Sequence, residues 1–145
     1  MPSRTLAVVA LALLLGCSDT DVDHSLVVEI PATVAAIPAG TLHVVLFRYH
    51  PLLMDGPATR VDHMRIPFSH RADRATFVRA RVQGRGVQGE RFYIAVDGCA
   101  VTAEGLRSIL MDGQQLALPA YVRMRPREVH LAPCITEEGD WTTTP

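Results

Sequence analysis

Most of the chain consists of short stretches in which apolar and polar residues alternate. A period of two is typical of β-strands, because successive side chains point to opposite faces of a strand. Residues 42–47 are apolar at nearly every position, which predicts a central strand covered on both faces. Seven short strands of this kind predict an all-β domain, an antiparallel β-sandwich. These strands are centred on residues 26–30, 42–47, 64–68, 77–82, 92–97, 122–125 and 129–131.

Glycine, proline and aspartate mark the expected connections between the strands, because these residues favour tight turns. Residues 102–111 are ambiguous. Leu106, Ile109 and Leu110 have the spacing of one face of a short helix, and a strand fits equally well. We expect turns at residues 38–40, 55–57, 84–86, 97–98 and 112–113.

The N-terminus departs from this alternation. Residues 6–15 form an unbroken apolar run that follows Arg4 and precedes Gly16. Ten residues make a helix of about 15 Å, half of the roughly 30 Å hydrocarbon core of a bilayer. A positive residue, a short apolar run and a small residue are together typical of a secretory signal. We therefore expect residues 1–16 to be a helical signal peptide that is cleaved off.

The end of the apolar run is more specific. Leu14-Leu15-Gly16-Cys17 resembles the lipobox of bacterial lipoproteins. The resemblance implies that the Cys17 thiol receives a diacylglycerol, that the chain is cut just before it, and that the new amino group is acylated. Several acyl chains would anchor the protein stably. It implies a lipid-anchored protein of the bacterial envelope, with Ser18 favouring the outer over the inner membrane; the alternative is ordinary cleavage that leaves Cys17 a thiol.

The cysteines fit such a compartment. If Cys17 is lipidated, Cys99 and Cys134 remain as a pair in an oxidising space. We predict a disulfide between them, which would close a loop of about 36 residues. Two buried thiols are the alternative. The predicted sandwich also resembles, in pattern alone, the small immunoglobulin-like or transthyretin-like modules of envelope lipoproteins, and no functional residue follows from that likeness.

The remaining chain divides into three parts. Residues 17–25 are polar and acidic and predict a flexible tether, with Asp19, Asp21 and Asp23 imitating only the start of a calcium loop. Residues 26–134 form the β-sandwich domain. Residues 135–145, which contain the single Trp141, predict a flexible tail.

Charge suggests one candidate surface. All 14 basic residues of the chain are Arg, and its formal net charge is -1. Arg79 and Arg81 share one face of a predicted strand, as do Arg123 and Arg125. If the two strands are neighbours, these residues form a basic outer face for anionic headgroups, lipopolysaccharide phosphates or an acidic partner. The alternative is an ordinary solvated face.

Catalytic and metal-binding motifs give little support to an enzyme. The six His lack local ligand spacing, and His63 beside Asp62, with His70 across a possible turn, is the most suggestive group. No GxSxG motif is present, and the adjacent Ser69 and His70 would point apart on a strand. We expect no cofactor, no metal site and no enzymatic activity.

The sequence therefore predicts a lipid-anchored envelope protein with a binding or structural role. Its partners would be an envelope protein, a polysaccharide or an anionic lipid, and not nucleic acid. The alternatives are a carrier or sensor of a small ligand or metal that uses the His of the body, and a hydrolase with an unrecognised site.

Overall fold

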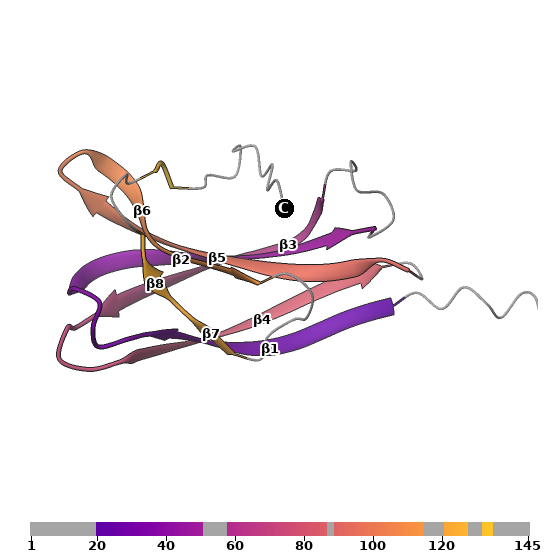
Figure 1. Cartoon of the computed structure of the whole chain (residues 1–145), viewed down its shortest axis with the longest axis horizontal. Coiled ribbons are helices and arrows are strands. Elements are labelled where there is room, and N and C mark those ends of the chain that lie inside the picture. Colours follow the sequence, from indigo (N-terminus) through magenta and orange to yellow (C-terminus); the bar gives the residue numbers. More distant parts are fainter. Residues whose placement is uncertain (1–19, 51–57, 87–88, 115–120, 128–131, 135–145) are drawn as a thin grey trace, which may run out of the picture.

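The computed structural model describes residues 20–50, 58–86, 89–114, 121–127 and 132–134, and these form an all-β sandwich (Figure 1). The predicted fold class is confirmed. Within the described residues there is no helix of the length and apolar character needed to cross a membrane. The strands are β1 (Thr20–Ile30), β2 (Ile37–Tyr49), β3 (Thr59–His70), β4 (Thr76–Gly86), β5 (Arg91–Thr102), β6 (Gly105–Gln114), β7 (Tyr121–Arg123) and β8 (Arg125–Pro126).

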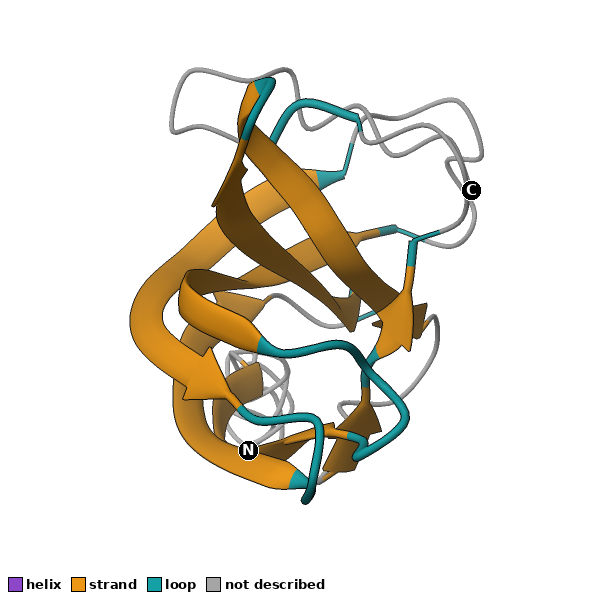
Figure 2. Ribbon diagram, turned by 90° about the vertical axis from the view of Figure 1, so that its left-hand side faces the viewer, coloured by secondary structure: helices purple, strands orange, loops and turns teal. Residues whose placement is uncertain are grey.

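The strands form two sheets that pack face to face (Figure 2). One sheet has three strands in the order β4-β1-β7, and the other has five in the order β3-β2-β5-β6-β8. Neighbouring strands are antiparallel except β1 and β7, which run parallel through the pairs Val27–Tyr121 to Glu29–Arg123. Strand β1 is therefore the centre of the smaller sheet, and β2 and β5 are central strands of the larger one.

The core lies between the sheets and follows the alternation read from the sequence. Alternate residues of β1, such as Leu26, Val28 and Ile30, face alternate residues of β2, such as Leu42 and Val44, across the interior. Removing this apolar surface from water is the main stabilising contribution of the fold. Strand β2 is buried on its other face as well, where Val45 and Phe47 lie, which confirms residues 42–47 as a central strand covered on both faces.

The tether expected over residues 17–25 is wrong from residue 20 onward. Residues 20–25 are the first half of β1 and pair with β4, from Thr20 opposite Gly86 to Ser25 opposite Arg81. Val22 is buried, whereas Asp21 and Asp23 point to solvent on the opposite face of the strand. Of residues 21–25 only Val22 is buried, so the segment resembled a polar tether in the sequence. Its outward acidic side chains fit in a strand because arginines of β4 pair with them. The signal peptide, Cys17 and the tail of residues 135–145 lie outside the described residues.

Several predicted turns are also wrong, because their glycines lie inside strands. Gly40 is in β2, and a Cβ there would come within 2.7 Å of the ring of Phe68 and 2.9 Å of the Cys99 carbonyl oxygen. Gly98 is in β5, and a Cβ there would lie 2.8 Å from the Cβ of Leu110. Both glycines sit at register shifts of the larger sheet. They therefore mark bulges and close packing rather than chain reversals.

The other predicted turns lie either within strands or outside the described residues. Residues 112–113 lie in β6, and residues 84–86 end β4. In the ambiguous region 102–111, Thr102 ends β5, residues 103–104 form a turn and residues 105–111 belong to β6, so the region is strand rather than helix. Gly105 begins β6 with a φ of +108°. Residues 55–57 and the strand expected at 129–131 lie outside the described residues.

Candidate functional site

The predicted arginine face is divided between the two sheets. Arg79 and Arg81 on β4 and Arg123 on β7 point outward from the three-stranded sheet, on either side of β1. Arg125 belongs to β8, which pairs with β6 in the other sheet. The four arginines therefore do not form one surface. The sequence pattern predicted which way each side chain points, but it could not show that β8 joins the other sheet.

The outer face of the three-stranded sheet is charge-paired rather than basic. Strand β1 lies between the two arginine-bearing strands, and its acidic residues alternate outward toward them. Because the acids expected in a tether belong to this face, they neutralise much of its positive charge. The ion pairs are Arg81–Asp23, with N–O distances of 2.7 and 2.6 Å, Arg85–Asp21 at 3.6 Å and Arg123–Glu29 at 3.7 Å.

The Arg81–Asp23 ion pair shifts the pKa values of both its residues. Arg81 donates two hydrogen bonds to the Asp23 carboxylate, which lowers the pKa of Asp23 and raises the pKa of Arg81. A lowered folded-state pKa stabilises the fold above the unfolded pKa, and this stabilisation is lost as the pH falls through the folded value. Both side chains are exposed, so salt screens the interaction.

We expect an NMR titration of Asp23 to give a pKa below the ordinary value of 3.8. The substitution Arg81→Gln should return this pKa toward 3.8, because it removes both hydrogen bonds to the carboxylate. Arg79→Gln is the matched control, because Arg79 lies on the same strand face but opposite Val27. An Asp23 titration that Arg81→Gln leaves unchanged would contradict the pairing.

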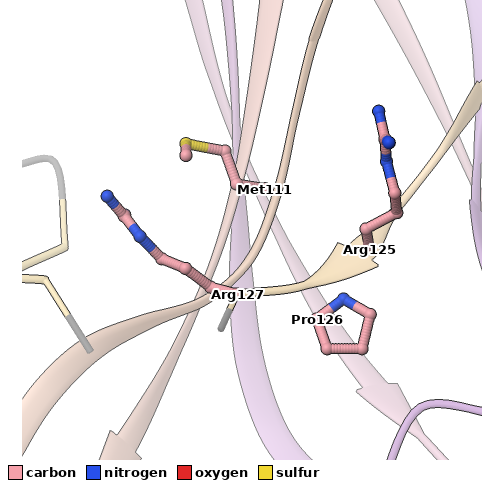
Figure 3. A pocket seen from close by; sticks show the side chains of 4 residues that line it. All are labelled: Met111, Arg125, Pro126 and Arg127. Atoms are coloured by element: carbon pink, nitrogen blue, oxygen red, sulfur yellow. The ribbon is translucent and has the colours of Figure 1, made fainter. Parts of the chain in front are cut away.

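Arg125 lines a shallow hollow on the larger sheet (Figure 3). The hollow measures about 500 Å³ and is bordered by Met111, Arg125, Pro126 and Arg127. The two guanidinium groups stand on either side of Met111 (Figure 3). Arg127 is already engaged, because its Nη1 donates a hydrogen bond to Ser108 Oγ at 3.0 Å. Through this hydrogen bond of Arg127, the hollow borders a cluster of polar side chains that includes Ser108.

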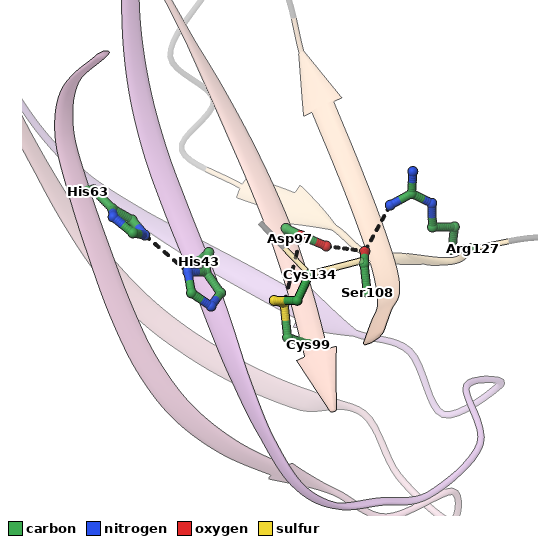
Figure 4. Close-up of a disulfide and its surroundings, with 7 residues drawn as sticks. All are labelled: His43, His63, Asp97, Cys99, Ser108, Arg127 and Cys134. Carbon is green, nitrogen blue, oxygen red and sulfur yellow. Dashed lines mark hydrogen bonds between the residues drawn. A yellow bond between two sulfur atoms is a disulfide. The ribbon is translucent and has the colours of Figure 1, made fainter. Parts of the chain in front are cut away.

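This polar cluster crosses the outer face of the five-stranded sheet (Figure 4). The strand register places its members side by side, because His63 lies opposite Val45, His43 opposite Asp97, and Cys99 opposite Ser108. All of these positions alternate with residues that face the core. Asp97 is 2% exposed and Ser108 is 0% exposed. We name His43, His63, Asp97, Cys99, Ser108, Arg127 and Cys134 the outer-face cluster.

The predicted pair of cysteines forms a disulfide within the cluster. Cys99 on β5 is bonded to Cys134, with the two Cα atoms 5.8 Å apart. The chain reaches this place along the edge of β6, where the Ser108 N–H donates to the Ala132 carbonyl at 3.1 Å and Pro133 forms a bridge with Arg107. The disulfide therefore fastens the C-terminal part of the described chain to the centre of the larger sheet.

The Asp97 side chain lies between the disulfide and Ser108. The Ser108 hydroxyl donates a short hydrogen bond to Asp97 Oδ1, and the Arg127 guanidinium donates to the same hydroxyl oxygen. The other Asp97 oxygen lies 3.7 Å from Cys99 Sγ, which has no proton to donate while it is part of a disulfide. The buried Asp97 carboxylate thus accepts a hydrogen bond from the Ser108 hydroxyl, whose oxygen accepts one from the Arg127 guanidinium.

Two imidazoles complete the cluster. His43 Nδ1 and His63 Nε2 are 3.0 Å apart, and one of these nitrogens must donate while the other accepts. The rings are stacked, with centroids 5.3 Å apart. A ring nitrogen of His43 and the sulfur atoms of Cys99 and Cys134 all lie within 4.8 Å of one another. Imidazole and thiolate are ligands that zinc and other thiophilic metals prefer.

The histidine group singled out from the sequence is not brought together. The buried His70 ring bonds Thr76 Oγ1 at 2.8 Å and the Val34 carbonyl at 3.1 Å, which fastens a loop to the end of β3. Because a carbonyl only accepts, His70 Nε2 carries the proton and Nδ1 accepts from the Thr76 hydroxyl. His63 instead turns to His43, and its backbone N–H donates to Asp62 Oδ1 at 2.8 Å.

The chemistry open to the cluster depends on which groups touch. A serine nucleophile needs an imidazole as its hydrogen-bonded base. Ser108 instead lies between a carboxylate and a guanidinium in the described part of the chain. Sequence reasoning missed Asp97 and Ser108, because Asp97 was assigned to a turn with Gly98 and Ser108 to an ambiguous region. For Asp97 the available signal was its place next to the core-facing Val96, whereas at Ser108 a register shift interrupts the alternation.

No protein-family model, no curated protein and no solved structure matches this chain.

Proposed function

We propose that this protein is a lipid-anchored component of the bacterial envelope, held through Cys17, whose β-sandwich has a non-enzymatic binding or structural role. The proposal is carried by the lipobox-like residues Leu14-Leu15-Gly16-Cys17, and the start of β1 at Thr20, three residues after Cys17, fits it. Three residues span at most roughly 11 Å. A lipid on Cys17 would therefore hold one end of the sandwich close to the membrane surface, without a long tether.

The direction of β1 then orients the body. Its 11 residues extend about 37 Å, so the β5–β6 hairpin at the opposite end would point away from the membrane (Figure 1). At the membrane-proximal end a hydrogen bond links the two sheets: Arg48 Nη1 on β2 donates to the Arg85 carbonyl on β4 at 3.1 Å. Arginines at this end favour contact with anionic headgroups. Arg60 and Arg91 lie at this end together with Arg48 and Arg85, which are ion-paired with Glu90 and Asp21.

The outer face of the three-stranded sheet supports a binding role. Phe77 on β4 is 61% exposed and Tyr121 on β7 is 47% exposed, on either side of β1. Exposed aromatic side chains surrounded by arginines are enriched where proteins bind partners. An envelope protein or a polysaccharide fits this mixture of aromatic and charged groups.

The anchor is tested by Cys17→Ala. We expect this variant to move from the membrane fraction to the soluble fraction of the producing bacterium, because it has no thiol to acylate. Ser18→Ala is the matched control and should stay with the membranes. A Cys17→Ala chain that remains in the membrane fraction would contradict the proposed anchor.

The binding role is tested by photocrosslinking in intact cells. A photoreactive residue in place of Phe77 or Tyr121 should capture an envelope macromolecule, because both positions face outward on the proposed surface. The same residue at Ala72, which is exposed in the turn before β4, is the control and should capture none. Equal capture at all three positions, or none at any, would argue against this face.

A further inference from the structure

We propose that the outer-face cluster becomes a metal site when its disulfide is reduced, with Cys99, Cys134 and His43 binding one thiophilic divalent ion such as Zn²⁺. The ligand atoms are already assembled, because a His43 ring nitrogen and both sulfur atoms lie within 4.8 Å of one another. All three residues are buried. In a tetrahedral site with zinc–sulfur bonds of about 2.3 Å and zinc–nitrogen bonds of about 2.0 Å, the ligand atoms lie roughly 3.5 to 3.8 Å apart. The two sulfur atoms, which are bonded to each other in the disulfide, must therefore move apart after reduction, while the His43 nitrogen is already near the required distance.

The neighbours of His43 suit a ligand role. Its Nδ1 is hydrogen-bonded to His63 Nε2 at 3.0 Å, which fixes the plane of the ring. We place the metal on the other ring nitrogen, Nε2. Metal-bound histidines usually have such a partner on the second ring nitrogen. His63 is thus a positioning residue. The nearby Asp97 carboxylate adds negative charge 3.7 Å from Cys99 Sγ, which favours a bound cation.

The backbone supports each ligand independently of the disulfide. His43 lies in the centre of β2, which pairs with β3 and β5 along its length. Cys99 lies in β5, and Cys134 follows residues bonded to the edge of β6. Reduction would therefore leave the two thiols close together. Three protein ligands leave the fourth tetrahedral position open to water or another small ligand.

The redox step balances with a dithiol as reductant. Thiol–disulfide exchange breaks the Cys99–Cys134 bond and leaves two thiols, while the dithiol is oxidised to its own disulfide. The metal then displaces both thiol protons to solvent and binds the thiolates without changing its oxidation state. The disulfide and the metal therefore exclude each other, and each fastens Cys134 to β5.

The test uses the full chain with Cys17→Ser in every sample, so that only the two cluster thiols can react. The protein is reduced with dithiothreitol, freed of it without oxygen, and titrated with Co²⁺ alone, and then with Zn²⁺. We expect the reduced protein to bind one Co²⁺ per chain, to show a thiolate-to-cobalt absorption band, and to lose that band when Zn²⁺ displaces it. The oxidised protein should show no band.

Variants separate this site from simple thiol binding. His43→Ala should weaken Co²⁺ binding at least about 10-fold, and His63→Ala should weaken it about 10- to 100-fold through the lost ring contact. His24→Ala, at an exposed position of β1, is the matched control and should bind as the parent does. Binding that is unchanged in His43→Ala would overturn the proposal.

Circular dichroism keeps the test decisive, because reduction removes a covalent link. If the reduced chain keeps its β-sheet spectrum, absence of the cobalt band overturns the proposal. If the reduced chain unfolds, one equivalent of Zn²⁺ must restore the spectrum, since metal binding would be coupled to folding. Failure of Zn²⁺ to restore it overturns the proposal equally.

Discussion

Replacing Cys134 with Ala is expected to lower the free energy of unfolding by about 4 kcal/mol. The disulfide joins residues separated by 35 positions, and closing a loop of that length restricts the unfolded chain far more than the folded one. In the folded state the bond also keeps residues 132–134 against the edge of β6. Urea denaturation of the oxidised parent and of Cys134→Ala, followed by circular dichroism, measures the difference.

Two further samples identify the cause of this loss. The parent in dithiothreitol with a metal chelator should have the same lowered midpoint as Cys134→Ala, since both lack the covalent link. Cys17→Ser should unfold like the parent, because Cys17 precedes the first strand. If Cys134→Ala has the same midpoint as the oxidised parent, the Cys99–Cys134 bond does not form in solution.

Replacing Asp97 with Ala is expected to lower the free energy of unfolding by about 3 kcal/mol. Asp97 is 2% exposed, and its carboxylate accepts the hydrogen bond of the fully buried Ser108 hydroxyl. Without it, that hydroxyl loses its acceptor and the Arg127 guanidinium loses the nearby negative charge. Asp97→Asn should cost less, because an amide oxygen can still accept from Ser108.

The matched control for Asp97 is Asp73→Ala. Asp73 also pairs with arginine, accepting from Arg71 at 3.2 and 3.1 Å, but its side chain is 57% exposed. An exposed pair of this kind is worth at most about 1 kcal/mol. Denaturation curves of both variants should therefore separate clearly. Equal losses for the two variants would show that burial does not decide the contribution of Asp97.

Alternation along the sequence was enough to predict the fold class and the inward face of most strands. Residues 42–47 were predicted to be covered on both sides, and Leu42 and Val45 are indeed buried on opposite faces of β2. The cysteine count was enough to predict the pairing of Cys99 with Cys134, once Cys17 was assigned to the anchor. These features depend on local spacing and on counting, which a single sequence contains.

Only the tertiary structure decided which strands are neighbours, and this changed both candidate sites. The acids of residues 20–25 joined β1 and met arginines of β4, so that a predicted basic face became a paired one. His43, His63, Asp97 and Ser108 come from four strands, and no local pattern links them. A period of two fixes the face on which a side chain lies, whereas strand order and register depend on contacts between distant residues.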